Sequence, residues 1–76
     1  MPEVPVMSSQ QVVKAFERLE WQVARRRGSH IIMVKEGHIA TLSIPAHKQV
    51  AKGTLRSLIR SAGLTVEEFI QTVQNL

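Results

Sequence analysis

Apolar side chains recur at helical spacing in three stretches of the chain. The first stretch follows Ser8 and Ser9, whose hydroxyls can cap the N-terminus of a helix. The second ends at Gly63, a residue that commonly terminates helices. Before the third, Thr65 and Glu68 have the spacing of a capping box. The predicted helices cover residues 9–20, 51–62 and 66–75.

Between the first two helices the apolar pattern shortens to the two-residue period of strands. Gly28-Ser29 and Glu36-Gly37 are turn signals. Pro45 is expected to end the last strand, because proline lacks the N–H of a ladder hydrogen bond. The predicted strands cover residues 21–27, 30–35 and 38–44.

The first of these strands alternates only roughly. Regular alternation places Val23 and Arg25 on one face and Ala24 and Arg26 on the other. A slip of one residue would exchange the two faces, so the register decides which arginines face a ligand.

Three strands joined by tight turns form an antiparallel meander, and the two longer helices can cover one of its faces. The sequence therefore predicts an α+β fold of the order α-β-β-β-α with a short C-terminal helix. This is the arrangement of double-stranded-RNA-binding domains. Residues 8–76 are expected to form a single domain, and residues 1–7, with two prolines and no periodicity, a flexible tail.

The composition excludes several classes of protein. With 76 residues the chain has room for one small domain. It contains no cysteine, which excludes disulfides, thiolate zinc sites and cysteine nucleophiles. It has no apolar run of about 18 residues and no signal peptide at its start, so we expect a cytoplasmic protein without membrane contact.

The net charge of +4 is unevenly distributed. Eight of the ten Lys and Arg residues lie between residues 21 and 60, where Glu36 is the one acid, so this stretch carries +7. A basic centre between acidic ends favours a polyanionic partner. A solvated basic surface without a partner is the alternative.

Few groups could carry catalysis. The spacing of His30, His38 and His47 matches no metal-binding motif, and no acid is placed to orient a histidine in a triad. We therefore expect neither a metal nor a small-molecule cofactor. His30 follows three consecutive arginines, and an imidazole beside cations can cleave RNA, which supplies its own 2′-hydroxyl nucleophile. A polar residue at a strand start is the other interpretation of His30.

Further cations follow on the second predicted helix, where Lys52, Arg56 and Arg60 recur every four residues. His47 and Lys48 precede its N-terminus, which attracts anions. A polyanionic partner would offset the repulsion within this stripe, but a solvated helix face explains it equally well. The expected RNA-binding residues are Arg26, Arg27, Ser29, Lys48, Lys52 and Arg56.

Three motifs match a known family in order and spacing: Gly28-Ser29-His30, Pro45-Ala46-His47 and the stretch over residues 52–64, in which Gly-Thr-Leu-Arg and Ala-Gly-Leu are the most specific parts. By these the chain resembles HicA-type toxins of bacterial HicA/HicB toxin–antitoxin pairs. The resemblance covers roughly residues 9–70. Many relatives carry histidine where this chain has Ile31 and Ala46.

The resemblance implies a metal-independent mRNA endonuclease that arrests translation, with His30 as the active histidine. It also implies a HicB-type antitoxin that folds against the toxin and blocks this histidine. Ser29 would orient the turn or donate a hydrogen bond. Two alternatives remain: a non-catalytic RNA-binding module of the same fold, and an interaction protein whose basic face binds an acidic partner.

Overall fold

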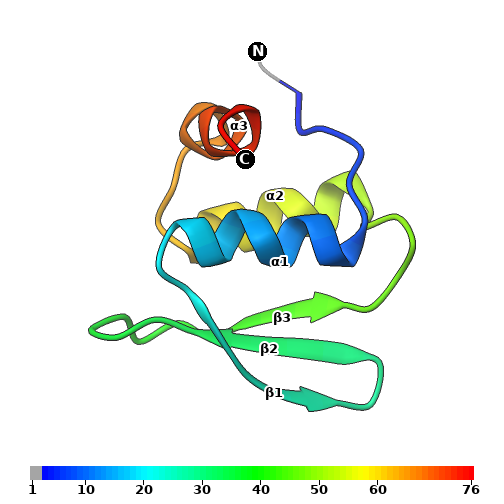
Figure 1. The fold of residues 1–76 in the computed structure, drawn as a ribbon, viewed down its shortest axis with the longest axis vertical. Helices are drawn as coiled ribbons and strands as arrows, with labels where there is room; N and C mark the ends of the chain where they lie inside the picture. Colours follow the sequence, from blue (N-terminus) through cyan, green and yellow to red (C-terminus); the bar gives the residue numbers. More distant parts are fainter. Residues whose placement is uncertain (1–2) are drawn as a thin grey trace.

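The chain folds into the order α1 (Ser9–Arg18), β1 (Gln22–Arg27), β2 (His30–Val34), β3 (Leu42–Pro45), α2 (Lys52–Ser61) and α3 (Val66–Gln74). The computed structural model describes residues 3–76. The sheet is antiparallel with the order β1-β2-β3. In Figure 1, α1 and α2 lie over one face of the sheet and α3 lies beyond them. The predicted α+β class and the three-stranded antiparallel meander are confirmed.

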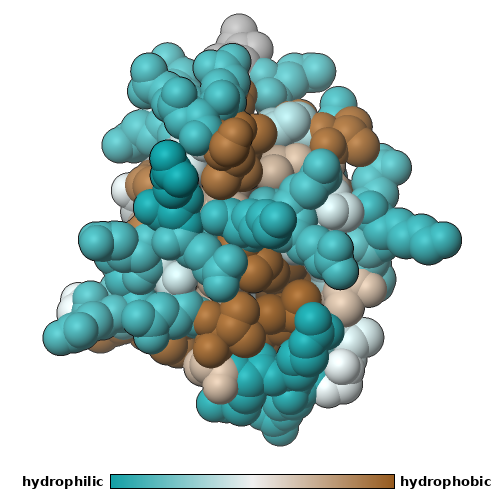
Figure 2. Space-filling model, viewed as in Figure 1, coloured by the Kyte–Doolittle hydropathy of each residue, from teal (hydrophilic) through white to brown (hydrophobic). Residues whose placement is uncertain are grey.

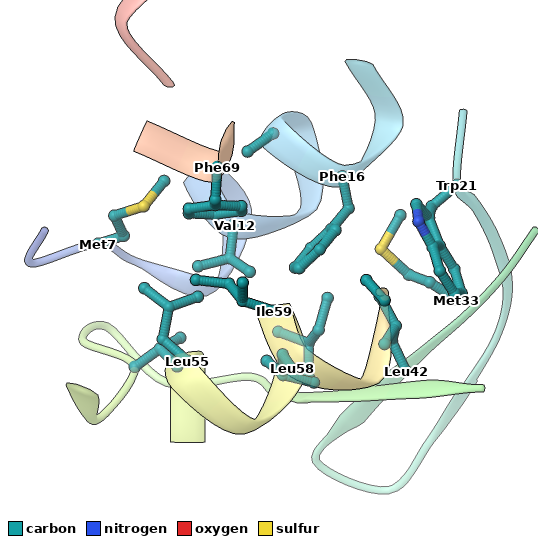
Figure 3. Packing of buried hydrophobic residues seen from close by; sticks show 14 of the residues in the cluster. Met7, Val12, Phe16, Trp21, Met33, Leu42, Leu55, Leu58, Ile59 and Phe69 are labelled. Atoms are coloured by element: carbon teal, nitrogen blue, oxygen red, sulfur yellow. The ribbon is translucent and has the colours of Figure 1, made fainter. Parts of the chain in front are cut away.

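The core lies between the sheet and the helices. Figure 3 shows Phe16 of α1, Met33 of β2 and Leu42 of β3 around the buried side chains of α2, with Phe69 of α3 closing the far side. Each of these side chains is fully buried. By contrast, all six residues of β1 are exposed, so this strand contributes no buried residue to the core.

The predicted helix starts follow the expected chemistry. Ser8 and Thr65 each cap a helix and each form a complete capping box. The first helix ends at Arg18, two residues earlier than predicted. Glu20 has a left-handed φ of 73°, and the Trp21 N–H donates to the Phe16 carbonyl at 2.9 Å, which closes the helix C-terminus.

The third strand is shorter than the predicted 38–44 and begins only at Leu42. Residues 38–41 belong to a loop instead, because the His38 side chain contacts this loop and Trp21. The His38 Nδ1 accepts a hydrogen bond from the Ala40 N–H at 3.2 Å. The centroids of the His38 and Trp21 rings lie 5.0 Å apart. Pro45 is the last residue of β3, where a missing N–H costs least.

The predicted tail is packed onto the domain over the part that the structure describes; its first two residues lie outside that part. Val4 and Met7 are buried. Met7 forms an isolated antiparallel bridge with Val50, whose N–H donates to the Met7 carbonyl at 2.8 Å. The burial arises from this distant contact, which no local pattern in the sequence encodes.

Candidate functional site

Two connections that are distant in the sequence meet at one end of the sheet. The β1–β2 turn consists of Gly28 and Ser29, and Gly28 has the positive φ of 59° that the first position of such a tight hairpin turn requires. The Ser29 carbonyl accepts a hydrogen bond from the Ala46 N–H at 2.7 Å. In the ladders His30 lies opposite Arg27 on one side and Pro45 on the other. The Gly-Ser-His and Pro-Ala-His motifs are therefore neighbours in space.

The N-termini of α1 and α2 lie at this same end of the molecule (Figure 1). The Ser9 N–H donates to the His47 carbonyl at 3.1 Å, which fixes the β3–α2 loop against the start of α1. Each helix N-terminus carries a partial positive charge from the aligned peptide dipoles. Both helices thus add positive potential to an end that already carries His30 and several cations.

A β-bulge in β1 changes the face of Val23 relative to the arginines that follow it. Val23 pairs with Met33 and Arg25 pairs with Ile32, so Ala24 is an extra residue without a partner of its own. The regular alternation predicted for this strand is therefore wrong. Because cross-strand partners share a face, Arg25 lies on the face of Ile32, which Val23 does not share.

The pairing of residues 25–27 with β2 divides the predicted arginines between the two faces of the sheet. Arg27 lies directly opposite His30, on the sheet face that the helices leave uncovered. Arg26 pairs with Ile31, which is buried beneath the helices, so Arg26 lies on the opposite face from His30. Arg25, which is not among the predicted RNA-binding residues, shares the open face with Arg27. The rough alternation of this strand was the one sequence signal for the bulge.

The remaining predicted cations lie on the β3–α2 loop and on α2, which belongs to the helical layer on the other side of the sheet. Lys48 lines a shallow hollow together with His47, Ala46 and the first residues of α1. The Lys52 Nζ lies 3.7 Å from a Glu3 carboxylate oxygen, and Arg56 follows one turn later on α2. The exposed Lys52–Glu3 pair contributes little to stability. The structure thus places Ser29 and Arg27 with His30, Lys48 at the adjacent loop, and Lys52 and Arg56 on α2.

The three histidines have different surroundings. The His38 ring packs against Trp21 and accepts the Ala40 N–H, which is a structural role. His47 is exposed and holds the start of α1 through its backbone carbonyl. The His30 side chain is exposed, and within residues 3–76 its imidazole forms no hydrogen bond or ion pair. Both of its ring nitrogens are therefore accessible to a ligand.

A shifted pKa lies away from this end, at Glu68. The Thr65 N–H donates a hydrogen bond to the exposed Glu68 carboxylate at 2.8 Å, and this bond, together with the nearby Thr65 side chain, lowers the pKa of Glu68 from its ordinary 4.5. Over the described part of the chain, no group of three His, Asp or Glu side chains is arranged to hold a metal ion. No helix in that part is long and apolar enough to cross a membrane.

A model of the protein family described as "HicA toxin of bacterial toxin-antitoxin" matches residues 9–64, well over half of the chain. The match contains the β1–β2 turn, the β3–α2 loop and α2, and it leaves out the N-terminal segment and α3. No curated protein and no solved structure matches the chain.

Proposed function

The chain belongs to the HicA toxin family of bacterial toxin–antitoxin systems, and we propose that it is a metal-independent endoribonuclease that cleaves mRNA with His30 as its single catalytic histidine. The observation that carries this proposal is the position of His30. It is exposed on the open sheet face, opposite Arg27, at the end where two helix N-termini lie.

In the proposed reaction a His30 ring nitrogen takes the proton of the ribose 2′-hydroxyl. The 2′-oxygen attacks the adjacent phosphorus, and the bond from phosphorus to the 5′-oxygen of the next nucleotide breaks. The products are a 2′,3′-cyclic phosphate and a 5′-hydroxyl end, whose proton comes from the imidazolium or from water. A strand without 2′-hydroxyls cannot react in this way.

The cations around His30 would hold the RNA and stabilise charge on the phosphorus. Arg27 is the nearest along the sheet, and an arginine can hold two phosphate oxygens at once. Phosphates farther along the RNA would be bound by Lys48, Lys52 and Arg56. Arg26 belongs to the other sheet face, so its contribution would be a long-range one.

A His30→Ala variant tests the mechanism, with His47→Ala as a matched control at the same end of the molecule. General acid–base catalysis contributes about 10²–10⁴-fold in rate, so His30→Ala should lose about that much cleavage of single-stranded RNA. His47→Ala should cleave at the parent rate. Equal cleavage by the His30→Ala variant and the parent protein would refute the mechanism.

A non-catalytic RNA-binding module is the second candidate, because no described side chain hydrogen-bonds to the His30 imidazole and orients it. Both candidates predict salt-sensitive RNA binding. Only the enzyme predicts new 5′-hydroxyl ends that disappear in the His30→Ala variant. In either case the family implies a cognate antitoxin, for which we propose a HicB-type protein.

A further inference from the structure

Strand β1 has a free edge. The sheet order is β1-β2-β3, so β1 pairs with β2 on one side, and within residues 3–76 no strand lies beside its backbone N–H and C=O groups on the other side. The bulge is confined to Val23–Arg25. Residues 25–27 are paired regularly with β2, so this part of the edge keeps the geometry that another strand needs.

An apolar hollow lies next to this edge, between β1 and α1. Its apolar lining comes from Val13 of α1, Val23 of β1 and Ile31 of β2. Val23 is 43% exposed, although it lies on the sheet face that the helices cover. Figure 2 shows hydrophobic surface in the region between α1 and β1, surrounded by hydrophilic side chains. An edge strand, a facing helix and an apolar floor are the parts of a strand-addition groove.

The basic residues around the groove favour an acidic segment as its ligand. Arg25, Arg26 and Arg27 lie along the edge, and Lys14 of α1 lines the hollow, against the single acid Glu17. Two copies of β1 placed side by side would bring arginines against arginines, which disfavours self-association. An acidic segment would instead find Arg25 and Arg27 on the open face, on either side of the position that faces the hollow.

We propose that the free edge of β1 binds an extended acidic segment of the antitoxin protein as a fourth strand. Residues of that segment opposite Arg25 and Arg27 would lie on the open face and be acidic. The residue between them would be apolar and would enter the hollow formed by Val13, Val23 and Ile31. The segment therefore has the pattern acidic–apolar–acidic.

This inference rests on the proposed pairing with an antitoxin and not on RNA cleavage. Its consequence for activity follows from Arg27, which lies opposite His30 and on the edge strand. A carboxylate of the partner bound to the Arg27 guanidinium would prevent Arg27 from binding a phosphate. The antitoxin could then exclude RNA without contacting the His30 imidazole.

Hydrogen exchange on the intact chain, with and without the purified antitoxin encoded beside its gene, tests the backbone pairing. Strand addition should slow the exchange of those β1 amides between residues 25 and 27 that point away from β2. If the antitoxin binds and these amides keep their free exchange rates, the proposal is overturned. It is also overturned if the free chain forms a dimer that protects the same amides.

Variants of the intact protein test the hollow. Val23→Glu places a charge in the groove, and Ile39→Glu makes the same change at a fully exposed apolar position in the β2–β3 loop. Val23→Glu should weaken antitoxin binding about tenfold or more, whereas Ile39→Glu should leave it unchanged. Equal affinities of the two variants would overturn the proposal. Arg25→Glu, at an exposed position outside the hollow, provides a second variant that should also lose at least tenfold.

RNA cleavage by Val23→Glu separates this inference from the proposed function. The variant should cleave RNA at the parent rate while escaping the antitoxin, because Val23 lies on the sheet face opposite His30. If both Val23→Glu and the parent lack cleavage but differ in antitoxin binding, the docking proposal stands and the enzyme proposal fails. If Val23→Glu loses RNA binding and keeps antitoxin binding, the groove is an RNA surface and the docking proposal fails.

Discussion

The pairing of β1 with β2 leads to a specific prediction about two adjacent arginines. Arg27 lies opposite His30 on the open face, whereas Arg26 lies on the face of the buried Ile31. If RNA binds on the open face, replacing Arg27 with alanine should remove a phosphate contact. Replacing Arg26 should not, although both variants lose the same charge.

The size of the effect follows from counterion release. Each phosphate that a protein neutralises on a single strand changes the slope of log K against log salt by about 0.7. Arg27→Ala should therefore flatten this slope by about 0.7. Between 50 and 200 mM salt, that is about a 2.6-fold smaller loss of affinity than the parent shows. Arg26 acts only through its long-range field, which is largely screened beyond about 10 Å at 0.1 M salt, so its variant should keep the parent slope.

The assay is fluorescence anisotropy of a short single-stranded RNA over a series of salt concentrations. Both substitutions are made in the His30→Ala background, so that the RNA stays intact during the titration. Equal slopes for the two variants would refute the assignment of faces. A larger change in the Arg26 variant would show that RNA binds on the helical side of β1.

Four further predictions concern the fold. Deleting Ala24 should leave the chain folded, by circular dichroism, with cleavage retained, because the extra residue goes and Val23 and Arg25 keep their faces; loss of the fold would contradict the bulge. Met7→Ala should lower the free energy of unfolding by about 2–4 kcal/mol in a urea titration, and a change below about 0.5 kcal/mol would contradict the packing of residues 3–7. Glu20→Gly should raise the free energy of unfolding by about 1 kcal/mol and the melting temperature by about 4–8 °C, because glycine adopts the left-handed conformation without strain. The pKa of Glu68 is lower in the folded chain than its ordinary 4.5, so its stabilising effect is present above pH 4.5 and is lost as the pH falls through the folded value; Glu68→Gln should remove this part of the acid destabilisation, measured by thermal melts from pH 6 to pH 3.

The elements that the sequence predicted well are those that depend on neighbouring residues. The hydroxyl of Thr65 and the carboxylate of Glu68 are three residues apart, so a capping box at the start of α3 can be recognised from four consecutive residues. The Gly28-Ser29 turn is equally local. The overall order of elements follows from such signals together with the change in period.

The features that the sequence did not predict depend on distant contacts. Met7 is buried because it pairs with Val50, and nothing in the sequence around Met7 indicates that partner. His38 leaves the predicted strand because its ring meets Trp21. Ala24 is an ordinary residue for a strand, and its bulge exists only relative to the partners of Val23 and Arg25. The regular pairing of residues 25–27 with β2 puts Arg26 on the face opposite His30 and Arg25 on the face of His30, and neither position was predicted.

The exposure of β1 explains how so small a domain can carry a dense basic surface. The buried residues come from β2, β3, the three helices, the segment before α1 and the connecting residues Trp21, Val50 and Ala62, and none of the six β1 residues is among them. The sequence of β1 is therefore not restricted by core packing, and it can contain three consecutive arginines. Residues 25–27 pair regularly with β2, so Arg25 and Arg27 lie on the face of His30 while Arg26 lies beside α1. If RNA uses the face and the antitoxin uses the edge, both partners compete for the same two arginines, and binding of one excludes the other through charge alone.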